Sequence, residues 1–382
     1  MKKESSLLDS ILWVSAYPPD RGRLSEYAEA LLDELVKLSP LKIIVLSDCK
    51  PTKQTLVEVK PVWRPDRLSS IIRLWFEVIK SRSKIVHFNL HLAVFGRSRI
   101  INFFGLLSVT VARFSMKKVV LTLHNIPEGI KLNVVGVKDN VINRIGLTLA
   151  TKIILSSANI VTVPVRHYVS LLRKRYGVKN IVWVPHGAWF TETSPTWRWR
   201  KGGLRVLFLG YLSSYKALKT LSDAVKDVGG ELLISGCPHP NFAIEGKKVL
   251  KDILNEKHIK YLGYVENSRL PELISHVDAI VLPYLTSTGT SGVVHLLSGL
   301  GSPFITFDTM EFRELKLDGA GIFLAKMSKD SLKDAISKVT SNRQLAETLS
   351  KRSRNFAENR SWNKVAKTYL NIYNSLIKNP VP

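Results

Sequence analysis

Short runs rich in Val and Ile alternate with amphipathic helical stretches along the whole chain. Between them lie segments such as residues 24–38, in which apolar residues recur every three or four positions. The thirteen predicted strands occupy residues 11–17, 42–48, 56–62, 84–90, 118–124, 159–165, 180–186, 204–210, 231–236, 260–265, 279–284, 303–308 and 321–324. Strands that alternate with helices form parallel sheets covered on both faces, so the pattern predicts an α/β fold with doubly wound parallel sheets.

The length of the chain and one break in this rhythm predict two domains. A chain of 382 residues exceeds one ordinary core, and residues 188–203 contain Pro, Gly and polar residues without periodicity. We therefore expect a linker there, joining Rossmann-like domains at 1–195 and 196–360 with a cleft between them. The last 55 residues have a helical pattern that breaks near Asn359, and we expect the helix at about 361–380 to pack back on the first domain.

The composition limits the cellular compartment and the kinds of binding partner that we expect. The formal net charge is +25, which favours nucleic acid, anionic lipid or phosphorylated substrates as partners. A source organism whose proteins are generally basic explains the same charge. The two cysteines, Cys49 and Cys237, exclude a disulfide framework and a thiolate metal site. The start of the chain lacks a signal-peptide pattern, and the apolar run at 100–114 is too short to span a bilayer. We expect a cytoplasmic protein, either soluble or peripheral on the membrane face.

Polar and glycine-rich residues follow two of the predicted strands in the second half. Thr288, Gly289, Thr290, Ser291 and Gly292 come after the strand at 279–284 and precede a helical pattern. Backbone N–H groups at a helix start attract phosphate, and hydroxyls add donors. An ordinary N-capped helix explains the same residues.

The other stretch follows the strand at 204–210. Gly210 ends this strand, and a helix is predicted to begin near Ser213 or Ser214, with Lys216 in its first turn. A cation there opposes the helix dipole, so a bound diphosphate would favour it. An exposed, solvated lysine is the alternative.

The first half places histidines and arginines at comparable positions. His124 follows a buried-type strand and can donate to a sugar hydroxyl, and His186 lies in a similar turn; a histidine bonded into the fold is the alternative. Gly22 and Arg23 lie between the first strand and the first helix, where they suit an anionic acceptor.

Several common motifs are absent from the sequence. We find no Walker-type phosphate loop, no Gly-x-Gly-x-x-Gly fingerprint, no nucleophile-elbow motif and no Asp-x-Asp pair. The histidines of HFNLH at 87–91 are spaced for a helix but lie in a predicted strand. We therefore expect neither a bound metal nor a cofactor.

Four segments together resemble retaining glycosyltransferases of the glycosyltransferase-B fold, of the group 1 or family 4 type. They are YPPDRGRLSEYAEAL, VPHGAWF, FLGYLSSYKALKTLSDA and SGVVHLLSGLGSPFITFD. The resemblance implies transfer of a hexose from a nucleotide-diphosphate sugar with retention of anomeric configuration and without a metal. It implies a donor site of Gly210, Tyr211, Lys216, Thr288, Gly289, Thr290, Ser291, Gly292 and Glu314, with His124 and Lys216 catalytic and Gly22, Arg23 and His186 on the acceptor side.

This chain departs from the family pattern at the carboxylates. Tyr211 replaces the family's arginine, and Thr288 and Leu296 replace its two paired glutamates, whereas Glu314 matches a family glutamate. A catalytically inactive sugar-nucleotide-binding or scaffold protein of the same fold therefore remains an alternative. A basic nucleic-acid-binding protein is another, although no known binding module is present.

The acceptor is the least constrained part of this interpretation. Residues 67–84 and 95–118 mix basic residues with aromatic and aliphatic ones, which suits an anionic lipid surface and a lipid-linked acceptor. Helices that face the core on one side and carry solvated Lys and Arg on the other explain the same composition. A polysaccharide acceptor also stays open.

Overall fold

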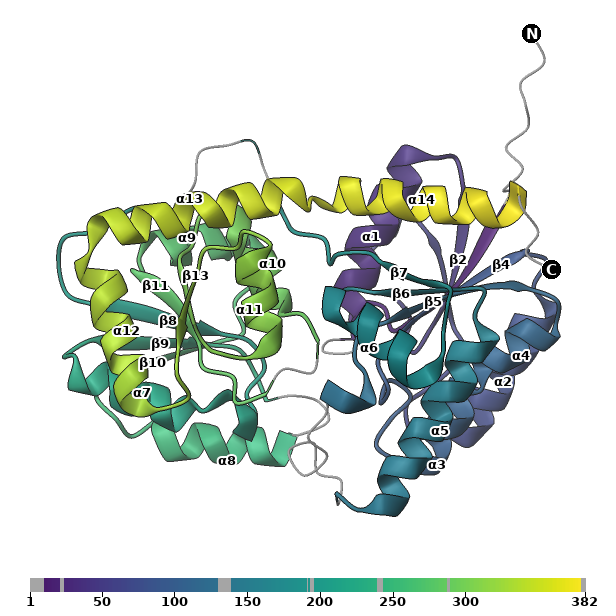
Figure 1. Cartoon of the computed structure of the whole chain (residues 1–382), viewed down its shortest axis with the longest axis horizontal. Coiled ribbons are helices and arrows are strands. Elements are labelled where there is room, and N and C mark those ends of the chain that lie inside the picture. Colours follow the sequence, from purple (N-terminus) through teal and green to yellow (C-terminus); the bar gives the residue numbers. More distant parts are fainter. Residues whose placement is uncertain are drawn as a thin grey trace, which may run out of the picture. The chain divides into compact units, whose positions relative to one another are not determined.

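The computed structural model describes residues 10–20, 24–129, 139–190, 192, 196–238, 243–286 and 289–378. These residues form two compact units: the described part of unit 1 lies within 10–185 and 362–378, and that of unit 2 within 186–361 (Figure 1). Each unit contains one parallel sheet.

The sheet of unit 1 has seven strands in the order β3-β2-β1-β4-β5-β6-β7. Its strands are β1 (Ser10–Val14), β2 (Lys42–Ser47), β3 (Glu58–Pro61), β4 (Ile85–Leu90), β5 (Lys118–Leu123), β6 (Ile160–Val163) and β7 (Ile181–Trp183). Its helices are α1 (Ser25–Leu38), α2 (Leu68–Lys80), α3 (Arg99–Leu106), α4 (Ser108–Phe114), α5 (Val141–Ser157), α6 (Arg166–Tyr176) and α14 (Trp362–Lys378), with a 3-10 turn η1 (Pro127–Gly129). α1 and α14 cover one face, and α2 to α5 pack together on the other (Figure 1).

The sheet of unit 2 has six strands in the order β10-β9-β8-β11-β12-β13. Its strands are β8 (Arg205–Leu209), β9 (Glu231–Ser235), β10 (Ile259–Gly263), β11 (Ala279–Leu282), β12 (Phe304–Phe307) and β13 (Ile322–Ala325). Its helices are α7 (Leu218–Asp227), α8 (Ala243–Ile253), α9 (Leu270–Ser275), α10 (Gly292–Leu297), α11 (Met310–Leu317), α12 (Lys329–Ser341) and α13 (Arg343–Asn359), with 3-10 turns η3 (Ser214–Lys216), η5 (Asn267–Arg269) and η6 (Ser298–Leu300).

The predicted doubly wound parallel sheets are confirmed. Each of the thirteen predicted strands coincides with an observed strand to within a few residues, and the helical break near Asn359 separates α13 from α14. The central strands β4, β11 and β12 are buried along their whole length, because helices cover both faces of each sheet. Residues 196–200, which we expected in the linker, lie against unit 2, where Trp197 donates its indole N–H to the carbonyl oxygen of Asp278.

A buried polar network ties α14 to the sheet of unit 1. His87 on β4 makes hydrogen bonds of 2.6 Å to the Tyr373 hydroxyl and 2.7 Å to the Thr122 hydroxyl. Tyr369 on α14 lies 2.8 Å from Thr122 and 3.2 Å from Tyr27 on α1. Burial keeps the pKa of His87 well below its usual value, so this histidine is neutral and its two ring nitrogens are both satisfied.

Candidate functional site

Both sheets reverse their winding direction beside their first strand. In unit 2, β8 pairs with β9 on one side and with β11 on the other, and the connections that follow β8 and β11 run in opposite directions. In open α/β sheets, ligands bind beyond the carboxyl ends of the strands at such a switch point. The residues here belong to two loops: the Lys216 loop (210–217) after β8 and the Thr290 loop (283–286 and 289–291) after β11.

Backbone contacts hold these two loops together. The amide of Leu285 donates to the carbonyl oxygen of Tyr215 over 2.9 Å. A Cβ added to Gly210 would lie 3.6 Å from Val293 Cγ2 and 3.7 Å from the Tyr284 hydroxyl. The carboxyl ends of β8 and β11 and the first turn of α10 therefore meet around Gly210.

Gly210 and Gly236 allow this close approach because neither carries a side chain. Gly210 has a φ of 136° and Gly236 a φ of 148°, which L side chains rarely adopt. A Cβ on Gly236 would lie 1.9 Å from the carbonyl oxygen of Gly210. The end of β9 thus supports the backbone of the Lys216 loop directly.

Lys216 occupies the centre of this arrangement. It lies in the 3-10 turn η3 rather than in the first turn of a helix as predicted, because Ala217 adopts a left-handed φ of 46° and α7 begins only at Leu218. Its ammonium nitrogen lies 3.1 Å from the ring centre of Tyr284 and 4.7 Å from that of Tyr215. The side chain is 8% exposed.

The charge of Lys216 has no carboxylate partner among the described residues. Burial alone lowers its pKa well below the usual value for lysine. The electron-rich faces of the two tyrosine rings compensate only part of the desolvation of an ammonium group. An anion bound here would raise this pKa again. Lys216 is therefore more stable in this position with a bound phosphate group than without one.

Three hydroxyl groups of the two loops lack a hydrogen bond of good geometry within the described part of the chain. The side-chain oxygens of Ser213, Thr290 and Ser291 are buried, and none has a hydrogen-bond partner of good geometry among the described residues. Ser213 lies near the Tyr215 phenol and Ser291 near the Tyr284 phenol. An unsatisfied buried hydroxyl costs about 1–3 kcal/mol, so the Thr290 hydroxyl is the clearest of the three as a donor for a ligand.

The helix after the Thr290 loop is shorter than its sequence pattern indicates. α10 spans only Gly292–Leu297, and its N-cap residue Ser291 makes no side-chain capping bond. Gly289, with a φ of 149°, precedes it. A helix of six residues contributes little dipole, so the donors at this place are side-chain hydroxyls and single amides.

Glu314 and Tyr211 complete the described part of the predicted donor set. Tyr211 follows Gly210 directly and is half-buried. Glu314 lies in α11, whose Phe312 packs against Tyr284 with 5.4 Å between ring centres. α11 therefore adjoins the site, and its buried Glu311, which the sequence analysis did not select, lies one turn before Glu314.

His124 lies at the carboxyl end of β5 in unit 1. The amide of Asn89 donates to the Ser15 hydroxyl over 3.0 Å and presents its oxygen to His124 Nε2 at 2.7 Å. Nε2 therefore carries the hydrogen, because an amide oxygen can only accept. The edge of the Tyr27 ring packs against the imidazole, with 4.6 Å between ring centres. This contact set fixes one tautomer and one ring orientation.

His186 belongs to unit 2 and contacts a second histidine. Its ring centre lies 4.4 Å from that of His295 on α10, and its Nδ1 lies 2.6 Å from the Gly187 carbonyl oxygen. Burial, together with the charge of nearby Arg360, lowers the pKa of His186 to about 4. Burial also lowers the pKa of His295, so both histidines are neutral. They support the Thr290 loop, because His295 Nδ1 donates to the carbonyl oxygen of Ser291 over 2.8 Å.

The predicted residues Gly22, Arg23 and Thr288 lie outside the described residues. The structure brings Gly210, Lys216 and Ser291 together around Tyr284, and it places His124 in the other unit. Sequence reasoning missed Tyr284, Tyr215 and Ser213. The signal for Tyr284 was an aromatic residue at the very end of the buried run AIVLPY, directly before the polar turn.

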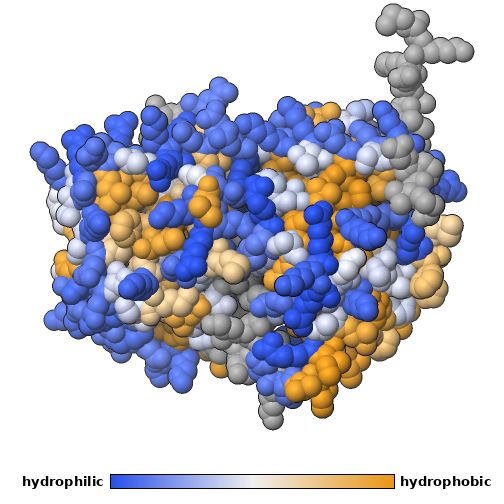
Figure 2. Space-filling model, viewed as in Figure 1, coloured by the Kyte–Doolittle hydropathy of each residue, from blue (hydrophilic) through white to orange (hydrophobic). Residues whose placement is uncertain are grey.

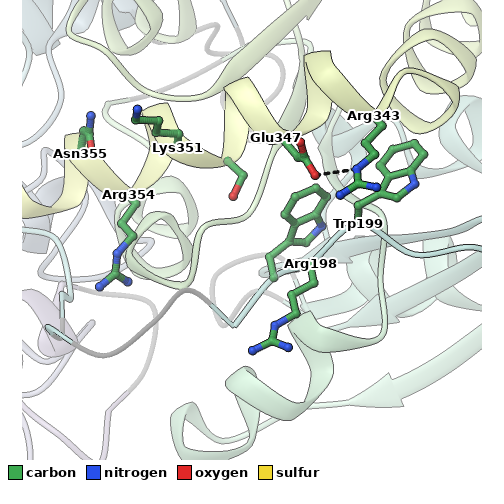
Figure 3. Close-up of a pocket in the computed structure, with 9 residues that line it drawn as sticks. Arg198, Trp199, Arg343, Glu347, Lys351, Arg354 and Asn355 are labelled. Atoms are coloured by element: carbon green, nitrogen blue, oxygen red, sulfur yellow. Dashed lines mark hydrogen bonds and ion pairs between the residues drawn. The ribbon is translucent and has the colours of Figure 1, made fainter.

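A separate groove of about 520 Å³ lies on unit 2 between residues 197–199 and α13 (Figure 3). Arg343, Lys351 and Arg354 line it together with Trp199, and Arg343 pairs with Glu347 over 2.8 Å. The groove adjoins residues that precede β8 and β11, so it lies at the amino edge of the sheet, away from Lys216. None of the predicted site residues lines it.

Two further observations concern metals and membranes. Within the described residues, no three His, Cys, Asp or Glu side chains come together as a metal-binding group. Every helix among them is also too short or too polar to traverse a bilayer.

Comparisons with known proteins agree with this architecture. Residues 190–356 match the family model described as glycosyl transferases group 1. No curated protein matches the chain by sequence.

Solved structures match over almost the whole chain at low identity. Sucrose-phosphate synthase from Thermosynechococcus elongatus has a TM-score of 0.74 and 16% identity, with 97% of this chain and 99% of that one covered. The Anabaena protein HepE in complex with UDP-glucose has a TM-score of 0.70 and 15% identity, covering 96% and 100%. A glycosyltransferase from Rickettsia africae has a TM-score of 0.68 and 16% identity, covering 97% and 99%.

These comparisons confirm the expected fold. The chain has the glycosyltransferase-B fold, and its residues 190–356 match the model of the group 1 glycosyl transferases.

Proposed function

We propose that this protein is a glycosyltransferase that moves a hexose from a nucleotide-diphosphate sugar to a carbohydrate or lipid-linked acceptor. The observation that carries the proposal is the buried Lys216, which has no carboxylate partner among the described residues and lies at the switch point, where the loop after the neighbouring strand β11 carries the buried, unpartnered hydroxyl of Thr290. Such a set of donors suits a diphosphate. The family match over 190–356 and the UDP-glucose complex of HepE support a sugar nucleotide as the ligand.

In this proposal the enzyme acts mainly on the leaving group. Cleavage of the bond between the sugar carbon and the diphosphate oxygen leaves negative charge on the diphosphate. The Lys216 ammonium and the hydroxyls of Thr290 and Ser291, already held in place, would stabilise that charge, and each such donor contributes about 10²–10³ in rate. His124 would donate its Nε2 hydrogen to a sugar hydroxyl, exchanging its bond to Asn89 for one to the substrate.

The proposal includes the finer points implied by the sequence resemblance. The sugar would be transferred with retention of configuration, Lys216 would take the charge-neutralising role without a metal, and Gly22 and Arg23 would lie on the acceptor side. His186, which the resemblance also implied there, packs on His295 beneath the Thr290 loop and would act on the donor side instead. NMR of the product's anomeric proton and activity in the presence of EDTA test the first two points.

Donor binding and turnover test the proposal directly. Thermal unfolding is measured with UDP-, GDP- and ADP-glucose, and a true donor at a hundredfold excess over its Kd stabilises the native state by about 2.7 kcal/mol. Lys216→Ala should lower turnover by about 10²–10³. Lys219→Ala is the matched control, because Lys219 is exposed on α7 and pairs with Asp223 and Glu256. Equal turnover in both variants would remove Lys216 from this role.

A non-catalytic sugar-nucleotide-binding protein is the second candidate. Leu296 on α10 and Thr288 occupy positions where the family has glutamates, so carboxylates that would hold the donor sugar are missing there. This candidate predicts the thermal shift without sugar release, either to water or to any acceptor. Release of the nucleotide diphosphate, measured by chromatography, therefore separates the two.

A further inference from the structure

Helices α2 to α5 expose an unusual amount of apolar surface on one face of unit 1. Large apolar side chains usually cover one another on such a layer, and these four helices do contact one another. Nevertheless, several of their side chains remain exposed to solvent: Leu68, Ile72, Phe76, Ile79, Ile100, Phe114, Val141, Ile142, Ile145 and Leu149, with Met116 directly after α4. We call this set the apolar face.

The clearest part of the apolar face is a stripe along α5. Val141, Ile142, Ile145 and Leu149 are between 53% and 79% exposed, and their spacing places them on one side of the helix. The opposite side of α5 is buried through Ala150 and Ile154, among others. The helix therefore has two apolar sides, of which only one is used by the fold.

Other exposed apolar side chains lie on neighbouring helices. Phe114 and Met116, at the end of α4 and just beyond it, are 83% and 89% exposed, and Phe76 projects from α2. Figure 2 shows hydrophobic residues gathered over the part of unit 1 where α3 and α5 lie in Figure 1. The stripe of α5 is contiguous by helix geometry, and a contiguous exposed apolar stripe marks an interaction surface rather than ordinary exposed residues.

The charge around the apolar face is mostly positive. Residues 66–118 and 139–157 contain twelve Lys and Arg residues and three acidic residues, Asp66, Glu77 and Asp139. Ten of these cations are exposed: Arg67, Arg73, Lys80, Arg82, Lys84, Arg97, Arg99, Arg113, Arg144 and Lys152. Arg144 pairs with Asp139 over 2.5 Å, which offsets its charge, whereas Arg99 bonds to the neutral amide oxygen of Asn143.

The combination of exposed apolar side chains and surrounding cations favours one of three possible partners for the apolar face. A second copy of the chain would bring like charges together, which opposes association. A protein partner would need an apolar surface ringed with acidic groups. A bilayer with anionic lipids supplies both negative headgroups and hydrocarbon within a few ångströms, and apolar stripes with flanking cations bind such surfaces.

We propose that the apolar face docks on an anionic lipid bilayer, with the α5 stripe in the headgroup and acyl boundary and the flanking Lys and Arg at the lipid phosphates. Docking itself follows from unit 1 alone. Its purpose, to bring the sugar-transfer site to a lipid-linked acceptor, rests on the proposed function.

Flotation of the full chain with vesicles tests the docking. The partition coefficient is measured with 1:1 phosphatidylcholine and phosphatidylglycerol, and with phosphatidylcholine alone, at 50 and 500 mM NaCl. We expect binding to the anionic vesicles at least tenfold above that to neutral ones, and weakening at high salt. Absence of binding to anionic vesicles at 50 mM NaCl would overturn the proposal.

Paired variants identify the surface. Ile142→Ser with Ile145→Ser should lower the partition coefficient at least tenfold. Ile244→Ser is the control, because Ile244 on α8 of unit 2 is 78% exposed but lies outside the apolar face. Lys80→Glu with Lys152→Glu should lower binding in the same way, whereas Lys351→Glu on α13 should not. Equal losses in test and control variants would contradict the assignment of the face.

Two further measurements separate the remaining outcomes. If the wild type is a dimer by light scattering and Ile142→Ser with Ile145→Ser makes it monomeric, a second copy covers the face and the lipid proposal fails. The thermal shift with sugar nucleotides, measured on the same variants, should be unchanged. Vesicle binding without a sugar-nucleotide shift would reject only the sugar transfer, and a shift without vesicle binding would reject only the docking.

Discussion

The Lys216 ammonium nitrogen lies 3.1 Å from the centre of the Tyr284 ring. Lys216 follows β8 and Tyr284 follows β11, so the contact joins the two strand ends on either side of the switch point. An aromatic face stabilises a cation without neutralising it. Because burial lowers the pKa of Lys216, an anionic ligand that binds here would raise this pKa and hold the ammonium form.

We predict that Lys216→Met stabilises the protein while it weakens sugar-nucleotide binding. Methionine keeps the packing against Tyr284 and removes a buried charge, so the free energy of unfolding at pH 7 should rise by about 0.5–2 kcal/mol. Chemical denaturation and the sugar-nucleotide thermal shift measure the two effects. A destabilised variant would mean that the charge already has a partner in the ligand-free protein.

The stability gained in Lys216→Met should depend on pH with a definite sign. The pKa of Lys216 is depressed in the folded state, so between that pKa and the unfolded value near 10.5 the unfolded chain binds more protons. Wild-type stability therefore rises with pH across this window, and the advantage of the variant should shrink toward pH 10.5. A constant difference from pH 7 to pH 10 would contradict the depressed pKa.

We predict that Thr290→Val lowers donor affinity or turnover with little cost to the fold. The Thr290 hydroxyl is buried without a partner among the described residues, so replacing it with a methyl group of the same shape should leave the free energy of unfolding unchanged or slightly raised. Turnover should fall by about 10²–10³ if the hydroxyl contacts the diphosphate. Ser302→Ala is the matched control, because its hydroxyl is also buried and unpartnered but precedes β12 at the amino edge of the sheet.

We predict that Gly236→Ala displaces the backbone of Gly210 and so disturbs the Lys216 loop. The added Cβ would lie 1.9 Å from the Gly210 carbonyl oxygen at a φ of 148°, so both the backbone conformation and the contact are unfavourable. The free energy of unfolding should fall by about 3 kcal/mol or more, and sugar-nucleotide binding should weaken. Gly203→Ala, where nothing lies within 4 Å of the added atom, should change neither by more than about 0.5 kcal/mol.

We predict that unit 2 loses stability in mild acid through His186. Its folded-state pKa is about 4 and its unfolded value about 6.5, so falling pH protonates the unfolded chain first. About 3 kcal/mol should be lost progressively as the pH falls from 6.5 toward 4. His186→Gln should show a smaller loss over this range in urea unfolding. An identical slope in wild type and variant would assign the acid sensitivity to other groups, such as His87 and His295.

The strands were predictable because buried parallel strands leave a strong local signal. Runs such as LFLG and AIVLPY are apolar over their whole length, and Gly or Pro ends them, so all thirteen strands and the doubly wound fold follow from pattern alone. The position of Lys216 near the carboxyl end of β8 was predicted in the same way.

The details of the site depend on contacts between distant segments. No local signal indicates that Tyr284 reaches Lys216, since this requires β8 and β11 to be neighbours in the sheet. The left-handed Ala217 replaced the expected helix start with η3, although alanine rarely adopts that conformation. The exposed stripe on α5 was also missed, because an apolar helix has the same sequence pattern whether one or both of its sides are covered.

The order of the units along the chain has a consequence for synthesis. The strands of unit 1 leave the ribosome first, but α14, which supplies Tyr369 and Tyr373 to His87 and Thr122, leaves last, after all of residues 186–361. The polar side chains of the first sheet that contact α14 therefore lack these partners while residues 186–361 are translated and can fold. A chain released before residue 362 would hold a finished second unit attached to an incomplete first one.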